Sequence, residues 1–466
     1  MSTRRDFIKT SGAFTLGAAL GTACSPEAQE GGGTTASGNS ASMLIENPDH
    51  PKPATYDRLP LEWYHANVKR LQEKLGERGL DGIFLKDRWN LVYFTGLFHS
   101  TTERPIACFI PADELAVYWY SPSIDRDLIE TWWSTENNYY YCYPHAEGGY
   151  PNRGEVVMGP PVDLLEWMLK GIEKLGYGDK KIALDHQPSR NRFKRMTEVL
   201  PKATFEEVDD VCMKMRMVKT PEEIALIQRT MNYFSRIMAY GRDYILDRGT
   251  DATDFEVQTA TMEYGTNLIM KDIERDGHPH TAVGIDVGAS CRTGAGCAYP
   301  HPNQFHHNKL KKGDSIQIAL WGGIGGYGGE LYSPWQIDPW PEGGEKMWEV
   351  MAEGSRMQIE MSKAGIRCQE IAKAVHEMQV ANGMQKYLYQ RVAHGQGMEG
   401  HQPPYLALGD ETVLEEGMTF SMEPGLFNPE GGYGYNPSDC VLVTKDKGVA
   451  MGSAPNLTKE WALLNL

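Results

Sequence analysis

Two short stretches near the C-terminus gather residue types that can do acid–base or metal chemistry. Residues 394–401 begin and end with a histidine, and residues 421–425 carry Glu423 directly before a proline. The reference pKa of an imidazole lies close to neutral pH, so a histidine can take up or release a proton, and a carboxylate can orient water or bind a cation. We therefore expect His394, His401 and Glu423 to meet in one active site.

A second group of candidate residues lies upstream, in a glycine-rich part of the chain. Glu330 follows the run 322–326, which predicts a β-hairpin and not a phosphate loop, because no Lys-Ser/Thr pair and no helix start follow it. Trp321 and Tyr327 flank this run and could bind a methylated cation, although aromatic residues on strands more often belong to the core. His301 stands in a loop between two prolines.

The segments that must position these residues begin at about residue 56, where helical and strand-like patterns start to alternate. Apolar residues recur at helical spacing over 63–80 and again over 164–175 and 191–200. Strand-like runs lie at 82–85, 91–94, 107–110, 115–118 and 181–184. This alternation predicts an α/β N-terminal domain over residues 56–209.

A second domain, residues 210–466, is expected to open with a sharp helix start. Thr220 supplies a capping hydroxyl, Pro221 occupies the first helical position and Glu223 the third. Two long helices, glycine-punctuated strands, another helix pair and a strand-rich end are predicted to follow. The two long helices are expected at 222–246 and 254–270, and the strands within 282–337. The second helix pair is expected within 345–382, and the strand-rich end follows it. The repeated order of helices and then strands predicts an α+β domain with internal pseudo-two-fold symmetry.

Residues 1–24 have the layout of a twin-arginine export signal. Two adjacent arginines precede the apolar run 13–23, which is too short to span a membrane permanently. Cys24 could carry a lipid anchor, and the Gly/Ser/Thr-rich residues within 25–55 would then form a flexible tether. We predict export to the periplasm, with lipid attachment through Cys24 left open.

Composition narrows the class of protein and its partners. The chain has 466 residues, enough for two domains, and its 41% hydrophobic and 23% charged residues are typical of a soluble globular protein. A net charge of -16 argues against nucleic acid and anionic membrane surfaces as main partners. The cysteines show no CxxC pairing of the kind that is typical of zinc sites. Cys291 and Cys297 could form a disulfide in an oxidising compartment.

With residues 313–319 and 326–330, the two C-terminal stretches resemble the pita-bread family of methionine aminopeptidase, prolidase, aminopeptidase P and creatinase. In the metal-dependent members, two aspartates, one histidine and two glutamates hold two metal ions. The matching positions in this chain are Ala319, Glu330, His394, Glu423 and Ser438.

Two of these five positions have therefore lost their ligand. A pair of hard divalent ions needs several carboxylates, which Ala319 and Ser438 cannot supply. The resemblance thus implies that this member has no two-metal centre, and that it most simply works without a cofactor. A single divalent ion on Glu330, His394 and Glu423 stays open, because two carboxylates and a histidine can hold one ion.

The resemblance to creatinase, the metal-free branch, is wider and runs from about residue 61 to the C-terminus. Residues 93–96, 103–107 and 212–219 are similar to creatinase segments. This likeness implies that His301 is the general acid/base and that Arg104 binds a substrate carboxylate in the neighbouring subunit of a homodimer. The glutamate that binds substrate in creatinase lies two residues beyond Glu330, where this chain has a tyrosine.

We expect a homodimeric hydrolase that cleaves a C–N bond in a small carboxylate-bearing nitrogen compound. His301 would move protons, while Glu330 and Glu423 would hold the substrate or orient water. His394 and His401 would complete the cavity.

Three alternatives stay open. The chain could be a lyase acting on a methylated sulfonium or ammonium carboxylate, with Trp321 and Tyr327 against the cation. It could be an Xaa-Pro dipeptidase that uses a single metal ion. It could also be a non-catalytic binding protein that reuses the cavity.

Overall fold

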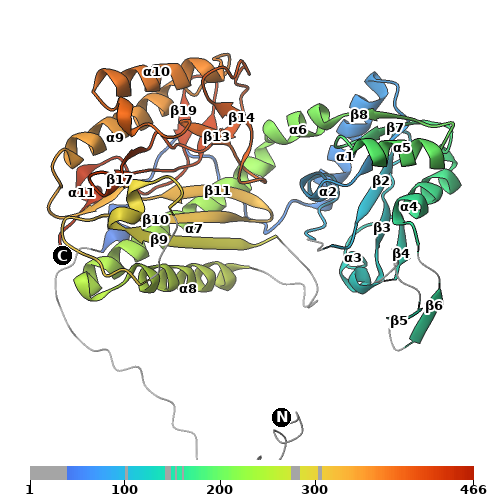
Figure 1. Cartoon of the computed structure of the whole chain (residues 1–466), viewed down its shortest axis with the longest axis horizontal. Helices are drawn as coiled ribbons and strands as arrows, with labels where there is room; N and C mark the ends of the chain where they lie inside the picture. The colour runs from blue at the N-terminus through green and yellow to red at the C-terminus, as the bar shows by residue number, and fades with distance from the viewer. Residues whose placement is uncertain are drawn as a thin grey trace, which may run out of the picture. The chain divides into compact units, whose positions relative to one another are not determined.

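The N-terminal half of the chain is built on a six-stranded mixed sheet with the order β4-β3-β2-β1-β7-β8 (Figure 1). The computed structural model describes residues 39–99, 103–141, 148–152, 155–159, 162–273, 284–302 and 307–466. The strands of this half are β1 (Gly82–Leu85), β2 (Ala107–Pro111), β3 (Tyr118–Pro122), β4 (Glu136–Tyr140), β7 (Lys181–Leu184) and β8 (Thr204–Glu207), with a separate hairpin of β5 (Gly148–Asn152) and β6 (Glu155–Gly159). The helices are α1 (Leu61–Glu77), α2 (Arg88–Thr95), α3 (Arg126–Ile129), α4 (Leu164–Ile172) and α5 (Arg190–Val199).

Burial on both faces explains why the central strand β1 is apolar at successive positions. It lies between the antiparallel β2 and the parallel β7. Ile83 and Leu85 pack into one core cluster, whereas Phe84 packs into another. When helices cover both faces of a strand, all of its residues are buried and apolar, and such strands are typical of α/β domains. The predicted α/β class of this half is confirmed.

One predicted strand of this half is wrong. Residues 91–94 belong to helix α2, which begins after Asp87, whose side chain accepts the backbone N–H groups of Trp89 and Asn90, both at 3.0 Å. The helix ends at Gly96, which has a positive φ of 77°. A short apolar run does not distinguish a buried strand from a buried helix, and the capping residues on either side decide.

The C-terminal half begins at the expected helix start. After the helix α6 (Asp209–Met217), α7 (Pro221–Arg248) opens with a capping box. Glu223 N–H donates to the Thr220 hydroxyl at 3.4 Å, and Thr220 N–H donates to the Glu223 carboxylate at 2.7 Å. Both bonds satisfy backbone donors that the first turn of a helix leaves free.

Two five-stranded sheets, each with a helix pair, form most of this half, and a two-stranded sheet and a short C-terminal helix complete it. The first sheet contains β9 (Asp286–Thr293), β10 (Ser315–Ile324), β11 (Tyr327–Tyr332), β12 (Trp335–Ile337) and β20 (Leu463–Leu464). The second contains β13 (Ala393–Gly395), β14 (Gln402–Leu406), β15 (Thr419–Phe420), β18 (Val441–Val443) and β19 (Gly448–Ala450), and β16 (Leu426–Asn428) pairs with β17 (Tyr433–Tyr435). The helices are α7, α8 (Asp254–Asp272), α9 (Gly344–Met361), α10 (Cys368–Ala381) and α11 (Lys459–Ala462). Figure 1 shows α7 and α8 along β9–β11 and α9 and α10 beside β13, β14 and β19, as the predicted α+β layout requires.

Alternation along β10 separates a core face from a polar face. Ile316, Ile318 and Leu320 are buried in the main core cluster. Ala319 and Trp321 point to the other face, because successive strand residues alternate. The register of the β10–β11 hairpin pairs Trp321 with Glu330, so this carboxylate lies on the same polar face.

The described cysteines are buried free thiols. Cys291 and Cys297 are among them, and the Cys297 thiol donates to the Arg292 carbonyl at 3.3 Å. The disulfide that these two cysteines could form is therefore absent from this structure. Across the described ranges, none of the helices combines the length and apolar character needed to cross a membrane. The predicted signal (residues 1–24), Cys24 and residues 25–38 of the predicted tether lie outside the described residues. The rest of the predicted tether, residues 39–55, is wrong as a flexible segment, because it packs against the C-terminal half: Ser40 N–H donates to the Asp243 carboxylate at 2.9 Å, and Ile45 N–H donates to the Ser453 carbonyl at 2.8 Å.

Candidate active site

The side chains of Glu330, His394, His401 and Glu423 meet at one point, although they come from four segments of both C-terminal sheets. Glu330 lies on β11, His394 on β13, His401 directly before β14, and Glu423 after β15. His394 Nε2 lies 3.2 Å from a Glu423 carboxylate oxygen and 3.6 Å from one of Glu330. His401 Nε2 lies 3.8 Å from the other Glu330 oxygen. The structure thus brings together four of the five predicted catalytic residues.

Backbone pairing fixes the strand of His394 against the segment that carries Glu423. His394 N–H donates to the Ser421 hydroxyl at 3.1 Å, and Ser421 N–H donates to the His394 carbonyl at 2.9 Å. Glu423 N–H donates to the Val392 carbonyl at 2.8 Å. The distance between the histidine and the glutamate is therefore set by a β-ladder and not by two mobile side chains.

His394 faces the two carboxylates with a cationic nitrogen. Its Nδ1 lies 3.2 Å from the Gly395 carbonyl, which can only accept, so Nδ1 carries a proton and Nε2 is left facing Glu330 and Glu423. Burial alone would lower the pKa of His394, but the hydrogen bonds and charges of the two glutamates outweigh it and raise the pKa to about 9. At neutral pH this buried residue is an imidazolium.

Glu330 is the most enclosed acid of the site. Its side chain is only 8% exposed, and burial raises its pKa, an effect that the hydrogen bond from His394 partly offsets. Tyr332 also opposes the rise in the pKa of Glu330, and so favours its ionised form.

His401 is the exposed, neutral histidine of the site. Its ring stacks on His394 with 3.7 Å between centroids and 15° between planes, and its side chain is 57% exposed. Burial of its inner side and the charge of His394 lower its pKa. A neutral imidazole that water can reach is suited to accept a proton.

His301, the predicted general acid/base, lies on an exposed loop after the short helix Gly294–Ala298. No hydrogen bond or ion pair among the described residues joins His301 to the other four residues. Its role in proton transfer stays a prediction.

The donor set bears on which metal sites the chain could form. Glu330, His394 and His401 offer ligand atoms within 4.8 Å of one another. A metal ion lies in the plane of an imidazole that binds it, and two nearly parallel rings stacked 3.7 Å apart cannot share one ion in this way. The set that fits one ion is therefore His394 with Glu330 and Glu423, whose nearest atoms already converge on His394 Nε2.

The two positions that would bind a second metal ion, residues 319 and 438, do not carry comparable donors. Ala319 has no ligand atom, and the Ser438 side chain is fully buried beside Tyr332, to which its backbone bonds. Among the described residues, the Ser438 hydroxyl has no hydrogen-bond partner. A neutral hydroxyl does not offset the charge of a second divalent ion as a carboxylate does. The loss of the two-metal centre stays a prediction.

The three predicted substrate-binding residues lie in different environments. Trp321 is 38% exposed, pairs with Glu330 across the hairpin, and covers Gly288, where a Cβ would fall 2.2 Å from its ring. Tyr327 is buried on the opposite face of β11, on the side that packs against α7, so the structure does not bring it to the site. Arg104 lies 3.3 Å from Glu103, and its role in a second subunit stays a prediction.

Arg292 on β9 is a site residue that the sequence did not single out. Its register places it opposite Gln317, on the polar face of the sheet that carries Glu330 and Tyr332. Arg292 donates to the Gln317 side chain and to the carbonyls of Tyr299 and Pro300. The only signal in the sequence is a charged residue inside a strand-like run, which is uncommon in a buried sheet.

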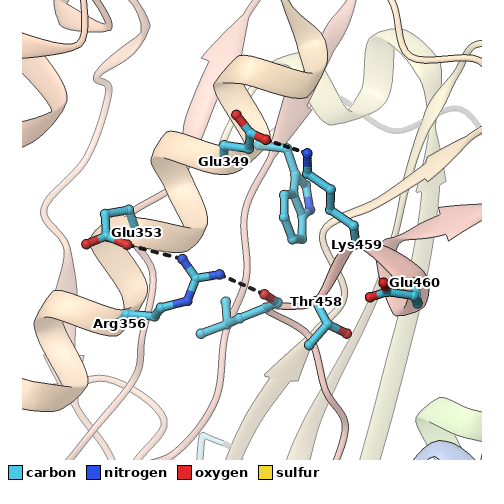
Figure 2. Close-up of a pocket in the computed structure, with 8 residues that line it drawn as sticks. Glu349, Glu353, Arg356, Thr458, Lys459 and Glu460 are labelled. Atoms are coloured by element: carbon cyan, nitrogen blue, oxygen red, sulfur yellow. Dashed lines mark hydrogen bonds and ion pairs between the residues drawn. The ribbon is translucent and has the colours of Figure 1, made fainter.

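A surface pocket on α9 lies apart from these residues (Figure 2). It has a volume of about 510 Å³ and is lined mainly by charged residues of α9 and α11. Arg356 pairs with Glu353 at 3.1 Å, and Lys459 pairs with Glu349 and Glu345. Because both basic side chains of the pocket are exposed and already paired with acids, the pocket is best explained as a solvated ion-pair cluster.

The chain is similar to known proteins over most of its length. Residues 227–445 match metallopeptidase family M24, and residues 67–218 match the creatinase/prolidase N-terminal domain. An Xaa-Pro dipeptidase of Pyrococcus furiosus is 24% identical over 81% of this chain and 95% of its own. A creatinase of a Bacillus species is 24% identical over 81% and 87%. The solved structure of dipeptidase PepE from Mycobacterium ulcerans has a TM-score of 0.68, with 19% identity over 88% of this chain and all of its own, which shows the fold.

Proposed function

Because the chain belongs to the creatinase/prolidase pita-bread family and is a hydrolase acting on C–N bonds, we propose that it cleaves a small carboxylate-bearing nitrogen compound without a two-metal centre. One observation carries this proposal. His394 Nε2 already faces both remaining carboxylates, while Ala319 and Ser438 stand where further metal ligands would be needed. An imidazolium there supplies part of the positive charge that metal ions would supply.

The roles of the residues follow from their exposure and charge. Buried Glu330 and Glu423, with His394 between them, present carboxylate oxygens that can orient a water molecule or an N–H group of the substrate. Neutral His401, together with His301, can take the proton of the attacking water as the new C–O bond forms. The same proton then passes to the leaving nitrogen as the C–N bond breaks.

A second candidate function rests on the donor set of His394, Glu330 and Glu423. These residues could hold a single divalent ion, which would polarise a peptide carbonyl or lower the pKa of a bound water. The chain would then be an Xaa-Pro dipeptidase, as the similarity to the Pyrococcus furiosus relative suggests. On this hypothesis, dipeptide hydrolysis should be lost on chelation and return when one ion is added per protomer.

The test is a product assay on the purified mature protein, with creatine-like, betaine-like and Xaa-Pro compounds as substrates. We expect hydrolysis of a carboxylate-bearing compound, and its loss when His301→Ala is introduced without change in the circular-dichroism spectrum. Release of an alkene product would show the lyase alternative instead. Binding of these compounds without turnover of any would favour a non-catalytic binding protein.

Assembly and localisation belong to the same proposal. Arg104 would reach the substrate of a neighbouring subunit, so we propose a homodimer, which light scattering would test and a monomer of full activity would contradict. We also propose export by the twin-arginine route, with Cys24 as the lipid-attachment residue of an anchored form. Cell fractionation of the wild type and of Cys24→Ala distinguishes an anchored from a free periplasmic protein.

A further inference from the structure

Arg292 is a cation on the floor of the site whose position is fixed by three neutral acceptors. Its Nε donates to the Gln317 side-chain oxygen at 2.7 Å, and its Nη1 donates to the carbonyls of Pro300 at 2.9 Å and Tyr299 at 3.3 Å. Gln317 is held in turn, because its Nε2 donates to the Asn436 carbonyl. The guanidinium plane is therefore set before any ligand arrives.

None of the described acidic residues forms an ion pair with Arg292. In the part of the chain that the structure describes, its bonds all go to an amide oxygen and to carbonyls, and its Nη2 donates to none of the residues. The side chain is half-buried, so a small solute can reach it. An arginine with a fixed plane and two free N–H groups is suited to bind a carboxylate oxygen.

Arg292 shares one face of the sheet with Glu330. The register places Arg292 opposite Gln317, and it places Tyr332 and Glu330 opposite Ala319 and Trp321, which are on the same face of β10 because side chains alternate along a strand. The loop carbonyls that Arg292 holds directly precede His301. A carboxylate on Arg292 would thus leave the rest of a small substrate between the histidines and the acidic pair.

We propose that Arg292 binds the substrate carboxylate from within the same protomer. This assignment rests on the proposed function, because it names the group that anchors the substrate of that site. It differs from the role expected for Arg104, which would act across a subunit interface. Arg292 would place the scissile bond, and it takes no part in proton transfer.

The experiment compares each carboxylate with its own amide: creatine with creatine amide, and Gly-Pro with Gly-Pro amide. Binding is measured by calorimetry and turnover by product formation, for the wild type, Arg292→Gln and Arg292→Lys. We expect Arg292→Gln to weaken binding and raise KM about tenfold to a hundredfold for the carboxylate and to leave the amide unchanged. Arg292→Lys should recover part of the loss. Arg356→Gln, which removes an exposed arginine from α9, is the matched control and should change neither the binding nor the KM of the carboxylate or the amide.

Several outcomes would overturn the inference. An equal loss of kcat for a carboxylate and its amide would show that Arg292 only positions the loop before His301. A wild-type protein that prefers none of the carboxylates to its amide would also refute it. If the wild type binds a carboxylate through Arg292 but hydrolyses none of the compounds, the assignment stands and the proposed function fails.

Discussion

The charge of His394 should make the stability of the protein depend on pH in the alkaline range. Glu330 and Glu423 raise the pKa of His394 from its reference of 6.5 to about 9. A raised pKa in the folded state gives stabilisation that is complete below pH 6.5 and is lost as pH rises through 9. One pKa unit corresponds to about 1.4 kcal/mol, so the contribution is about 3 kcal/mol at pH 6 and almost nothing at pH 10. The perturbation that removes it is His394→Gln.

The assay is chemical denaturation of chelator-treated wild type and His394→Gln at several pH values. The difference in unfolding free energy between the two proteins should shrink by about 3 kcal/mol from pH 6 to pH 10, while the effects of titrating groups that do not interact with His394 cancel. Parallel curves would refute the reasoning. Added divalent metal offers a further check, because an ion on His394 Nε2 needs a deprotonated ring and should stabilise the wild type more as pH rises.

Three other changes give distinct signals. Glu423→Gln removes one of the two charges beside the buried imidazolium, so NMR titration should show a lower histidine pKa, and an unchanged titration would contradict this. Thr220→Ala removes the hydroxyl cap of α7 and should lower the unfolding free energy by about 1 kcal/mol or more, measured by denaturation. Gly288→Ala places a methyl 2.2 Å from the Trp321 ring and should shift tryptophan fluorescence, whereas Gly296→Ala, with its nearest contact at 3.4 Å, should not.

The part of the site that short motifs encode could be predicted from the sequence. His394 and Glu423 lie in short motifs, residues 394–401 and 421–425, that could be identified in the sequence, whereas the backbone bonds that hold the two segments together are long-range. The face on which the Glu330 side chain lies could be predicted from the β-hairpin, because the turn sets the register of the two strands. The start of α7 was predictable for the same reason, since a capping box is local.

Features that depend on distant partners could not be predicted. The role of Arg292 depends on Gln317, Pro300 and Asn436, which only the folded chain brings together. Tyr327 lies on the same strand as Glu330, but its side chain is on the opposite face, which packs against α7. The presence of an aromatic residue in the sequence does not show which face it occupies. Residues 91–94 form a helix because of a cap at Asp87, although their apolar run suits a strand equally well.

The stacking of His394 on His401 was also beyond the sequence. The two histidines are seven positions apart, and glycines between them allow a tight return of the chain, which spacing alone does not fix. This stacking excludes one metal geometry, and it brings the charge of His394 close to His401, where it adds to burial in lowering the His401 pKa. It is the feature that separates a buried acid from an accessible base in this site.

Metal content measured together with turnover tests the central claim most directly. Protein treated with chelator, and then titrated with zinc, manganese or cobalt, should bind at most one ion per protomer and should hydrolyse its carboxylate substrate before any ion is added. Binding of two ions per protomer, with turnover that appears only as the second one enters, would contradict the account.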